Sequence, residues 1–246
     1  MKKLIWNSPE ETLDTLFDGR LKVLQSKRGY RFSIDALLLA YFARPQGEDR
    51  IIDLGTGCGI IPLIFAFRRQ TERSVGVEIQ PSLADLARRN AALNRVCGRV
   101  KIWEKDFTRL GNRRWKEKFD RVISNPPYRK LGTGRLNPRE EKALARHEIR
   151  STLEDVLRAA RYLLKEGGRL AMIYPAFRFA DLIREAVRFR LEPKRLQFVH
   201  SRAGEEACLV LLEALKGGRS QIRVLPPLFL FDPAGRYTSE AEKLFR

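Results

Sequence analysis

The chain has 246 residues, of which 43% are apolar and 32% are charged, and its formal net charge is +18. This length fits one α/β domain with small additions, and the apolar content is enough for a large core. No apolar run approaches the ~20 residues that a membrane span needs, and no long apolar segment follows the first charged residues, which argues against a signal peptide. We therefore expect a cytoplasmic protein.

The charge balance points to a polyanionic partner. The chain has 48 Lys and Arg against 30 Asp and Glu, and contacts to phosphates supply most of the affinity in nucleic-acid binding. The alternative is that the basic surface serves solubility or a hot habitat. The cysteines, Cys58, Cys97 and Cys208, are odd in number and far apart, so no disulfide or zinc framework is predicted. With only two histidines, we predict no metal site.

Residues 1–45 are predicted to form an N-terminal extension that packs on the main domain. Ser8 followed by a proline predicts a short helix that runs to about Phe17. Two short strands are predicted next, over 21–25 and 30–32. A helix is then predicted from Ser33 through Phe42, with a mostly buried apolar face.

Residues 46–215 show alternating strand and helix patterns and are predicted to form the main domain. Strands are predicted over 50–54, 74–78, 99–103, 119–124, 170–174, 196–200 and 207–213, and helices over 60–69, 81–94, 151–164 and 177–190. This alternation predicts the α/β class, with a doubly wound, mostly parallel sheet of seven strands. Residues 216–246 are predicted to form an extended tail on the core, in which Pro226 and Pro227 exclude a central strand.

Asn125-Pro126-Pro127-Tyr128 directly follows the predicted strand 119–124. In open α/β sheets, ligands bind just outside the carboxyl ends of the strands. Asn125 offers a side-chain carbonyl and Pro126 a backbone carbonyl, and the fixed φ of the two prolines stiffens the turn. Two such acceptors would localise the lone pair of a planar amino group, while Tyr128 lies flat on a planar substrate. The pattern favours attack by an amine on an electrophile that needs no metal, such as a sulfonium methyl group; a plain loop is the alternative.

A glycine-rich turn, Asp53-Leu54-Gly55-Thr56-Gly57-Cys58-Gly59, follows the first strand of the alternation. Its G-x-G-x-G spacing differs from the dinucleotide fingerprint, and the absence of G-K-S/T excludes a P-loop. An acid followed by a glycine turn suits a ligand with an amino-acid end and no pyrophosphate, because glycine lets the backbone approach a ligand closely. Cys58 is interpreted as a small residue that fits the turn.

Carboxylates also follow or end the next two strands. Glu78 can accept hydrogen bonds from both hydroxyls of a ribose, and Asp106 can accept one from the exocyclic amine of adenine. Phe107 or Ile79 can pack against the ring. Each carboxylate alone has an ordinary loop residue as its alternative. Polar groups at four successive strand ends together predict a nucleoside-binding site.

The glycine-rich turn, the two carboxylates and the N-P-P-Y tetrapeptide together resemble the class I S-adenosylmethionine-dependent N-methyltransferases. Residues 25–40, 145–148 and 226–228 look like the tRNA1(Val) (adenine-N6)-methyltransferase family, and the resemblance covers nearly the whole chain. It implies S-adenosyl-L-methionine as the cofactor and the adenosine immediately 3′ of the anticodon of a valine tRNA as the target. The implied catalytic residues are Asn125, Pro126, Pro127 and Tyr128. The implied cofactor-binding residues are Arg31, Phe32, Asp35, Asp53, Gly55, Thr56, Gly57, Glu78, Ile79, Asp106, Phe107 and Asn125, the first three near the methionine part.

The segment from 129 to 150 is long for a loop in a compact domain, which itself suggests a function. Its candidate RNA-binding residues are Arg129, Lys130, Arg135, Arg139, Lys142, Arg146 and His147. We favour a clamp that orders on tRNA; a solvated, partly helical surface loop is the alternative.

Three other functions use the same features. A release-factor glutamine methyltransferase also carries N-P-P-Y, because a glutamine amide presents the same planar amino group, but its helical N-terminal domain has no counterpart here. A DNA adenine methyltransferase would need a target-recognition domain that the sequence does not reveal. A non-catalytic RNA-binding module with a retained cofactor pocket is disfavoured by the intact Asn125 to Tyr128.

Overall fold

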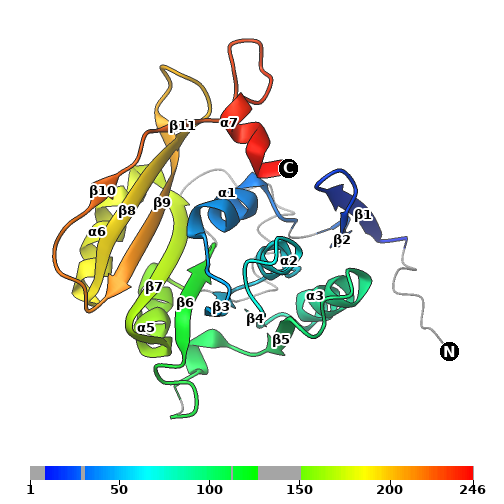
Figure 1. Ribbon diagram of the computed structural model, residues 1–246, viewed down its shortest axis with the longest axis horizontal. Helices are drawn as coiled ribbons and strands as arrows, with labels where there is room; N and C mark the ends of the chain where they lie inside the picture. The colour runs from blue at the N-terminus through cyan, green and yellow to red at the C-terminus, as the bar shows by residue number, and fades with distance from the viewer. Residues whose placement is uncertain (1–8, 29–30, 112, 127–150, 246) are drawn as a thin grey trace, which may run out of the picture.

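The computed structural model describes residues 9–28, 31–111, 113–126 and 151–245. A central β-sheet lies between two layers of helices, with α1, α2 and α3 on one face and α5 and α6 on the other (Figure 1). The prediction of an α/β fold with a mostly parallel sheet is confirmed.

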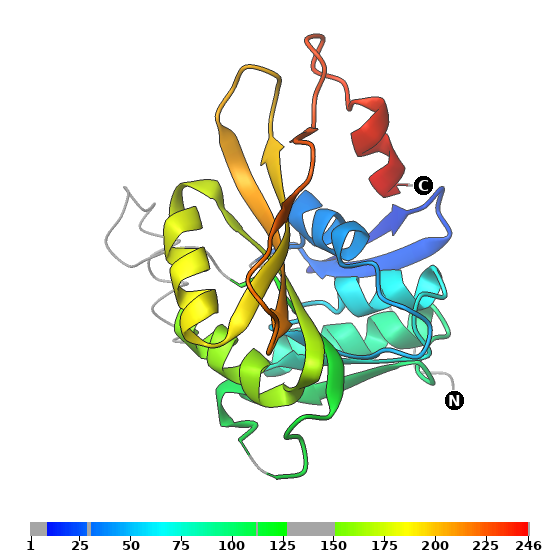
Figure 2. The same ribbon diagram turned by 60° about the vertical axis from the view of Figure 1, so that its left-hand side comes forward.

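Seven strands form the body of the sheet, in the order β8-β9-β7-β6-β3-β4-β5. Their bounds are β3 Arg50–Leu54, β4 Arg73–Glu78, β5 Val100–Glu104, β6 Phe119–Ser124, β7 Leu164–Pro175, β8 Leu191–His200 and β9 Ala207–Lys216. Strand β9 runs antiparallel to both of its neighbours, β7 and β8, and the pairs among β3 to β7 are parallel. Two short strands of the tail, β10 (Arg223–Val224) and β11 (Leu228–Phe229), pair with β8 (Figure 2) on either side of Pro226-Pro227, as expected of a segment excluded from the sheet centre.

An antiparallel hairpin, β1 (Glu11–Leu16) with β2 (Leu21–Ser26), precedes the sheet. The predicted helix running to Phe17 is therefore wrong, and residues 31–32 form no strand. Exposure in β1 alternates with the period of a strand from Thr12 to Leu16, and every residue of β1 has a partner in β2. Pairing along the whole length of β2 outweighs the local helix-start signal of a serine and a proline.

The helices agree with their predicted positions to within a few residues. They are α1 Ile34–Ala43, α2 Ile60–Phe67, α3 Pro81–Leu93, α5 Leu153–Leu163 and α6 Phe179–Arg188. The described residues also include the short 3-10 turns η1 Phe107–Arg109, η2 Ala176–Arg178 and η3 Lys243–Phe245. Thr152 begins α5 with a capping box, in which it exchanges hydrogen bonds with Asp155. A short helix near the end of the chain, α7 (Ser239–Glu242), was not predicted.

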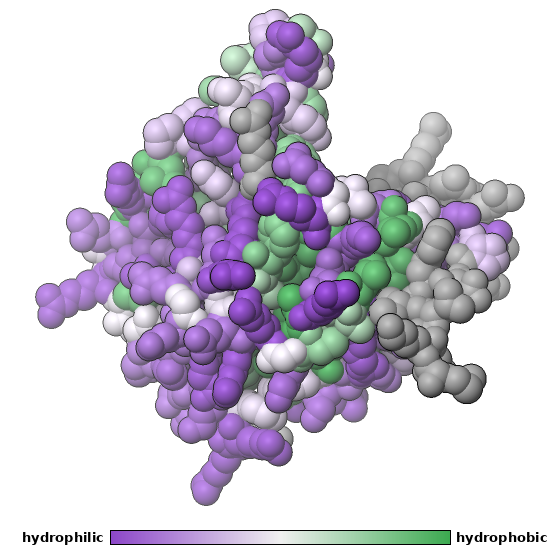
Figure 3. All heavy atoms as spheres, turned by 45° about the vertical axis from the view of Figure 1, so that its right-hand side comes forward, coloured by the Kyte–Doolittle hydropathy of each residue, from purple (hydrophilic) through white to green (hydrophobic). Residues whose placement is uncertain are grey.

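The sheet is buried on both faces because alternate residues of each strand face different helix layers. Ile51 and Ile123 pack in the core with α1, α2 and α3, whereas Ile52 and Val122 pack in the core with α5 and α6. On the face drawn in Figure 3, polar side chains surround a central group of apolar ones. Among the described residues, no helix has both the length and the apolar character to cross a membrane. The predicted boundaries near residues 45 and 215 stay a prediction.

Candidate active site

Four parallel strands end side by side at one edge of the sheet, in the order β6-β3-β4-β5. Leu54 of β3 lies opposite Ser124 and Val77, and Glu78 lies opposite Glu104. The residues at and just after these strand ends therefore lie in one row. This row contains the groups predicted from the sequence, which are Asn125, the glycine-rich turn, Glu78 and Asp106. At ~4.8 Å between neighbouring strands the row is roughly 15 Å long. Such a row suits an extended ligand with several polar groups.

Asp53 of β3 is buried within the row. The Thr56 hydroxyl donates a hydrogen bond of 2.6 Å to Asp53 Oδ2, while Oδ1 has no hydrogen-bond partner among the described residues. Burial raises the pKa of Asp53 to about 7, against the lowering effect of the Thr56 bond, and the charge of Glu78 raises it further. A buried carboxylate oxygen left in this way favours a ligand that brings a donor or a positive charge.

The glycine-rich turn is held by β4. The amides of Gly55 and Thr56 both donate to the carbonyl of Val77 at 2.9 Å, and the Gly57 amide donates to Glu78 Oε2 at 2.8 Å. Gly55 is exposed and has a φ of +76°, a conformation that glycine adopts at no steric cost. A ligand can therefore approach this backbone with no side chain in between.

The two carboxylates after the glycine-rich turn have different surroundings. Glu78 is buried and also accepts from the Gln80 amide at 2.9 Å; desolvation raises its pKa, although the hydrogen bonds from Gln80 and Gly57 oppose the shift. Asp106 caps η1 by accepting from the amide and hydroxyl of Thr108 at 2.9 and 2.6 Å. Their predicted neighbours Ile79 and Phe107 are half-buried.

The end of β6 carries the predicted oxygen acceptors. The Ser124 hydroxyl donates to the Leu54 carbonyl at 3.1 Å, which joins the end of β6 to the end of β3. Asn125 is half-buried and Pro126 is buried. Pro127, Tyr128 and the candidate RNA-binding residues from Arg129 to His147 lie outside the described residues.

The segment before α1 is held against the hairpin. Arg31 Nη2 donates to Asp14 Oδ2 at 2.6 Å, and the Phe32 amide donates to the buried Gln25 Oε1 at 2.9 Å. Asp35 is half-buried, and desolvation raises its pKa.

Cys58 is a buried residue of the glycine-rich turn. Burial raises the pKa of its thiol to about 12, and the charges of both Asp53 and Arg31 act on it. The thiol stays protonated at neutral pH, in keeping with its interpretation as a small residue that fits the turn.

Asn90 supports the site and escaped the sequence analysis. From α3, its side-chain amide donates to the carbonyls of Leu24 and Cys58, both at 3.0 Å, and its oxygen accepts from the Leu24 amide at 2.7 Å. One turn later, Asn94 pairs with the amide and carbonyl of Lys22 at 2.9 and 2.6 Å. The two asparagines satisfy backbone groups of β2 on the edge that does not pair with β1. Asn90 also joins β2 to the glycine-rich turn. A signal existed, because Asn90 falls on the apolar face of a predicted helix.

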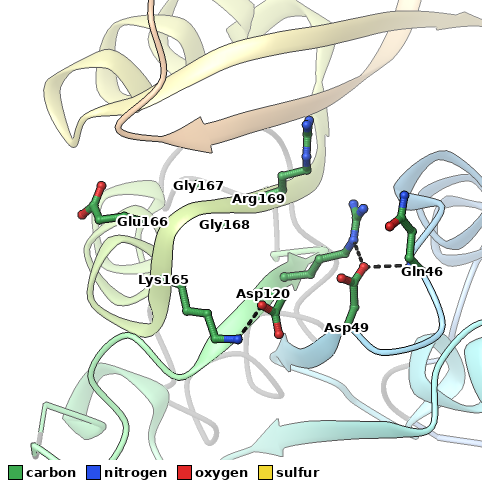
Figure 4. A pocket seen from close by; sticks show the side chains of 9 residues that line it. Gln46, Asp49, Asp120, Lys165, Glu166, Gly167, Gly168 and Arg169 are labelled. Atoms are coloured by element: carbon green, nitrogen blue, oxygen red, sulfur yellow. Dashed lines mark hydrogen bonds and ion pairs between the residues drawn. The ribbon is translucent and has the colours of Figure 1, made fainter.

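A cavity of about 290 Å³ lies at the opposite edge of the sheet, near the amino ends of β3, β6 and β7 (Figure 4). Its charged side chains are already paired: Arg121 with Asp49, and Lys165 with Asp120 at 2.6 Å. Because these pairs satisfy the charges internally, we assign the cavity a structural role. No group of three or more His, Cys, Asp or Glu side chains within the described ranges could hold a metal ion.

Residues 33–189 match the model of the methyltransferase small domain family. A protein of Porphyromonas gingivalis named tRNA1(Val) (adenine(37)-N6)-methyltransferase is 34% identical over 79% of this chain and 78% of its own length. A crystal structure described as a predicted O-methyltransferase of Agrobacterium tumefaciens superposes with a TM-score of 0.69 at 27% identity, covering 85% of this chain and 94% of that one. A putative class I S-adenosylmethionine-dependent methyltransferase of Listeria monocytogenes shares the fold, with a TM-score of 0.58 at 16% identity over 89% of this chain and 75% of that one.

Proposed function

Because the chain belongs to the methyltransferase small domain family and to the tRNA1(Val) (adenine(37)-N6)-methyltransferases, we propose that it transfers a methyl group from S-adenosyl-L-methionine to N6 of an adenosine in tRNA. The proposed target is the adenosine next to the anticodon of a valine tRNA, the position that the name of the relative specifies. The proposal includes a cytoplasmic location, where tRNA is found. The row at four strand ends, with oxygen acceptors at the end of β6, is the observation that carries it.

The residues of the row fit the proposed cofactor in their chemistry. Asp53, whose buried Oδ1 has no partner in the described part of the chain, suits the amino group of the methionine part. The open backbone at Gly55 suits close approach of the ligand, and Glu78 and Asp106 suit the ribose and adenine parts. When bound, S-adenosyl-L-methionine supplies an electrophilic methyl group. Arg31, Phe32, Asp35, Thr56, Gly57, Ile79 and Phe107 belong to the same proposal.

In this proposal the protein positions and activates the N6 amino group of the target adenine. Asn125 Oδ1 and the Pro126 carbonyl accept hydrogen bonds from the two N–H groups of the adenine amine, which localises the lone pair on nitrogen. Tyr128 stacks on the base once it has left its neighbours. The proton leaves to water after the transfer. Residues 129–147 are proposed to hold the RNA. Catalysis on this view is mainly positioning.

The test is Asn125→Ala. We expect this variant to bind the demethylated cofactor, S-adenosyl-homocysteine, with nearly the parent affinity, because Asn125 is only one of many groups in the row. Turnover on tRNA should fall by about two orders of magnitude or more, because the acceptor of one N–H bond is lost. Single-turnover methylation and calorimetry measure the two quantities. Near-normal methylation would refute the mechanism.

A protein glutamine methyltransferase remains the second candidate, since a glutamine amide presents the same planar group to Asn125 and Pro126. Labelled S-adenosyl-L-methionine incubated separately with total tRNA, total DNA and purified release factor separates the candidates. Nucleoside mass spectrometry of the tRNA then distinguishes N6-methyladenosine from a ribose O-methyl product. Label in release factor and none in tRNA would overturn the proposal.

A further inference from the structure

Phe177 is the most exposed large apolar residue in the described part of the chain. Its exposed fraction is 85%, and the next highest is 60%, for Val224. Most of the other described aromatic residues are at least partly buried, including Phe179 two positions later. An exposed phenylalanine ring contributes almost nothing to folding stability through burial. Folding stability therefore does not explain why a phenylalanine stands at this position.

Phe177 stands at the same edge of the sheet as the row. Strand β7 lies next to β6, with Met172 opposite Ser124. Asn125 follows Ser124 directly, and β7 continues to Pro175 before η2 presents Phe177. The ring therefore emerges one strand away from Asn125, on the side of β6 that faces away from the glycine-rich turn. Figure 1 shows β6 and β7 side by side.

The backbone that carries Phe177 is fixed on both sides. Pro175 before it is buried and pairs with Leu209 of β9. After it, the guanidinium of Arg178 lies 5.1 Å from the centre of the Tyr174 ring and forms an ion pair with Asp181 at 3.4 Å. Phe179 packs edge-on against Phe198, with 5.4 Å between ring centres. The exposed ring is thus held on an anchored turn, which lowers the entropy lost when a partner binds it.

The surroundings favour a flat partner over an apolar protein surface. The other exposed large apolar residues of the described ranges belong to different elements or, like Val187, to the far end of α6, so among the described residues Phe177 is not part of a broad apolar patch of the kind that marks a protein interface. A single exposed ring on a chain of net charge +18 suits a nucleic-acid base, because every base offers a face for stacking.

Building on the proposed function, we propose that Phe177 is a positioning residue that stacks on a base of the tRNA adjacent to the methylated adenosine. The stack holds the RNA while the target adenine occupies the site at Asn125. The ring touches neither the cofactor nor the amino group that reacts. It therefore contributes to the KM for tRNA and leaves the chemical step alone.

The first experiment compares Phe177→Ala and Phe177→Tyr with Val187→Ala, an exposed apolar residue of α6, as the matched control. We expect Phe177→Ala to raise the KM for tRNA by about tenfold or more, with single-turnover rate at saturating tRNA and affinity for S-adenosyl-homocysteine unchanged. Phe177→Tyr should restore KM. The dependence of KM on salt should keep its slope, because the ring neutralises no phosphate. An unchanged KM in Phe177→Ala would overturn the proposal, whereas failure of the parent protein to methylate any tRNA would overturn the proposed function itself.

The second experiment identifies the base. Transcripts of the tRNA that carry a single abasic site at successive anticodon-loop positions are tested with the parent protein and with Phe177→Ala. At one position beside the target, removal of the base should cost the parent protein affinity and cost Phe177→Ala nothing, because the stack is already gone. Additive costs at every position would refute the stack.

Discussion

Asp53 departs from the behaviour of a surface carboxylate because it is buried and half-satisfied. Its pKa of about 7 in the folded chain stands well above the ~3.9 of an unfolded chain. Between about pH 4 and pH 7 the folded state therefore holds a proton that the unfolded state releases, so folding stability falls as the pH rises through this window. At pH 7 and above, ionised Asp53 is a cost to the fold that a bound ligand can relieve.

Because the asparagine side chain in Asp53→Asn cannot ionise, the loss of folding stability between pH 4 and pH 7 should be smaller in this variant than in the parent protein. We expect the free energy of unfolding of the variant to exceed that of the parent at about pH 8 by at most about 4 kcal/mol, with little difference at about pH 4. Urea unfolding across this range without cofactor measures it. Thr56→Val is the control: it removes the hydrogen bond that lowers the Asp53 pKa, so the loss of stability should still begin near pH 4 but continue to higher pH and become larger. Parallel profiles for parent and Asp53→Asn would contradict the assignment.

At the residue scale, the sequence supplied the identities of the row but not its electrostatics. Asp53, Glu78 and Asp106 could be placed at strand ends because Asp53 and Glu78 stand in the last two positions of predicted strands and Asp106 follows one. Among the described residues Asp53 Oδ1 has no partner, and the Gly57 amide donates to Glu78. Both features depend on how β4 packs against the glycine-rich turn, which no local sequence pattern encodes. The capping role of Asp106 was open to prediction, since Thr108 two positions later can donate to it.

At the element scale, α3 supplies the hydrogen-bond partners for the edge of β2 that does not pair with β1. Asn90→Leu should leave the Leu24 amide and the Leu24 and Cys58 carbonyls without partners in a buried place, and we expect a loss of about 2–4 kcal/mol in the free energy of unfolding. The affinity for S-adenosyl-homocysteine should fall as well, because the bond to Cys58 holds the glycine-rich turn. Denaturant unfolding and calorimetry measure these effects.

Asn94→Leu is the matched control for Asn90→Leu. Its partner Lys22 is exposed, so water replaces the lost bonds, and the variant should lose less than about 1 kcal/mol with no change in cofactor affinity. Equal losses in the two variants would contradict a special role for Asn90.

The elements of the main domain were predictable because their periods are clear, and the hairpin shows where such prediction fails. The predicted strand 170–174 is a short apolar run that follows two glycines, and the structure keeps it within β7. The β1 segment alternates only weakly and follows a serine and a proline, so local signals favoured a helix. Its strand conformation comes from β2, which is itself held by Asn90 and Asn94. Because contacts with α3 and β2 determine the strand conformation of β1, the sequence of β1 itself predicts that conformation only weakly.

At the scale of the whole molecule, the net charge of +18 is unevenly compensated. On α6, Arg184 and Arg188 pair with Asp181 and Glu185 at 2.7 and 3.1 Å. Between β5 and β6, the exposed Arg113 and three lysines of the same segment have no ion pair with any described residue. Those lysines are Lys105, Lys116 and Lys118. The free cations of this segment begin beside Asp106, at the end of the row, where an RNA backbone can reach them.

This asymmetry predicts which charges bind phosphate. We expect the logarithm of the KM for tRNA to rise linearly with the logarithm of the salt concentration, and the combined variant Arg113→Glu, Lys116→Glu to reduce that slope by about 1.4–1.8, as for two lost phosphate contacts. The control, Arg184→Glu with Arg188→Glu, changes the net charge equally but acts on cations already neutralised by neighbours, so its slope should match the parent. If both variants lower the slope equally, net charge alone governs binding and the segment between β5 and β6 has no special part in it. If only the first does, the bound tRNA extends from Asn125 to the segment between β5 and β6.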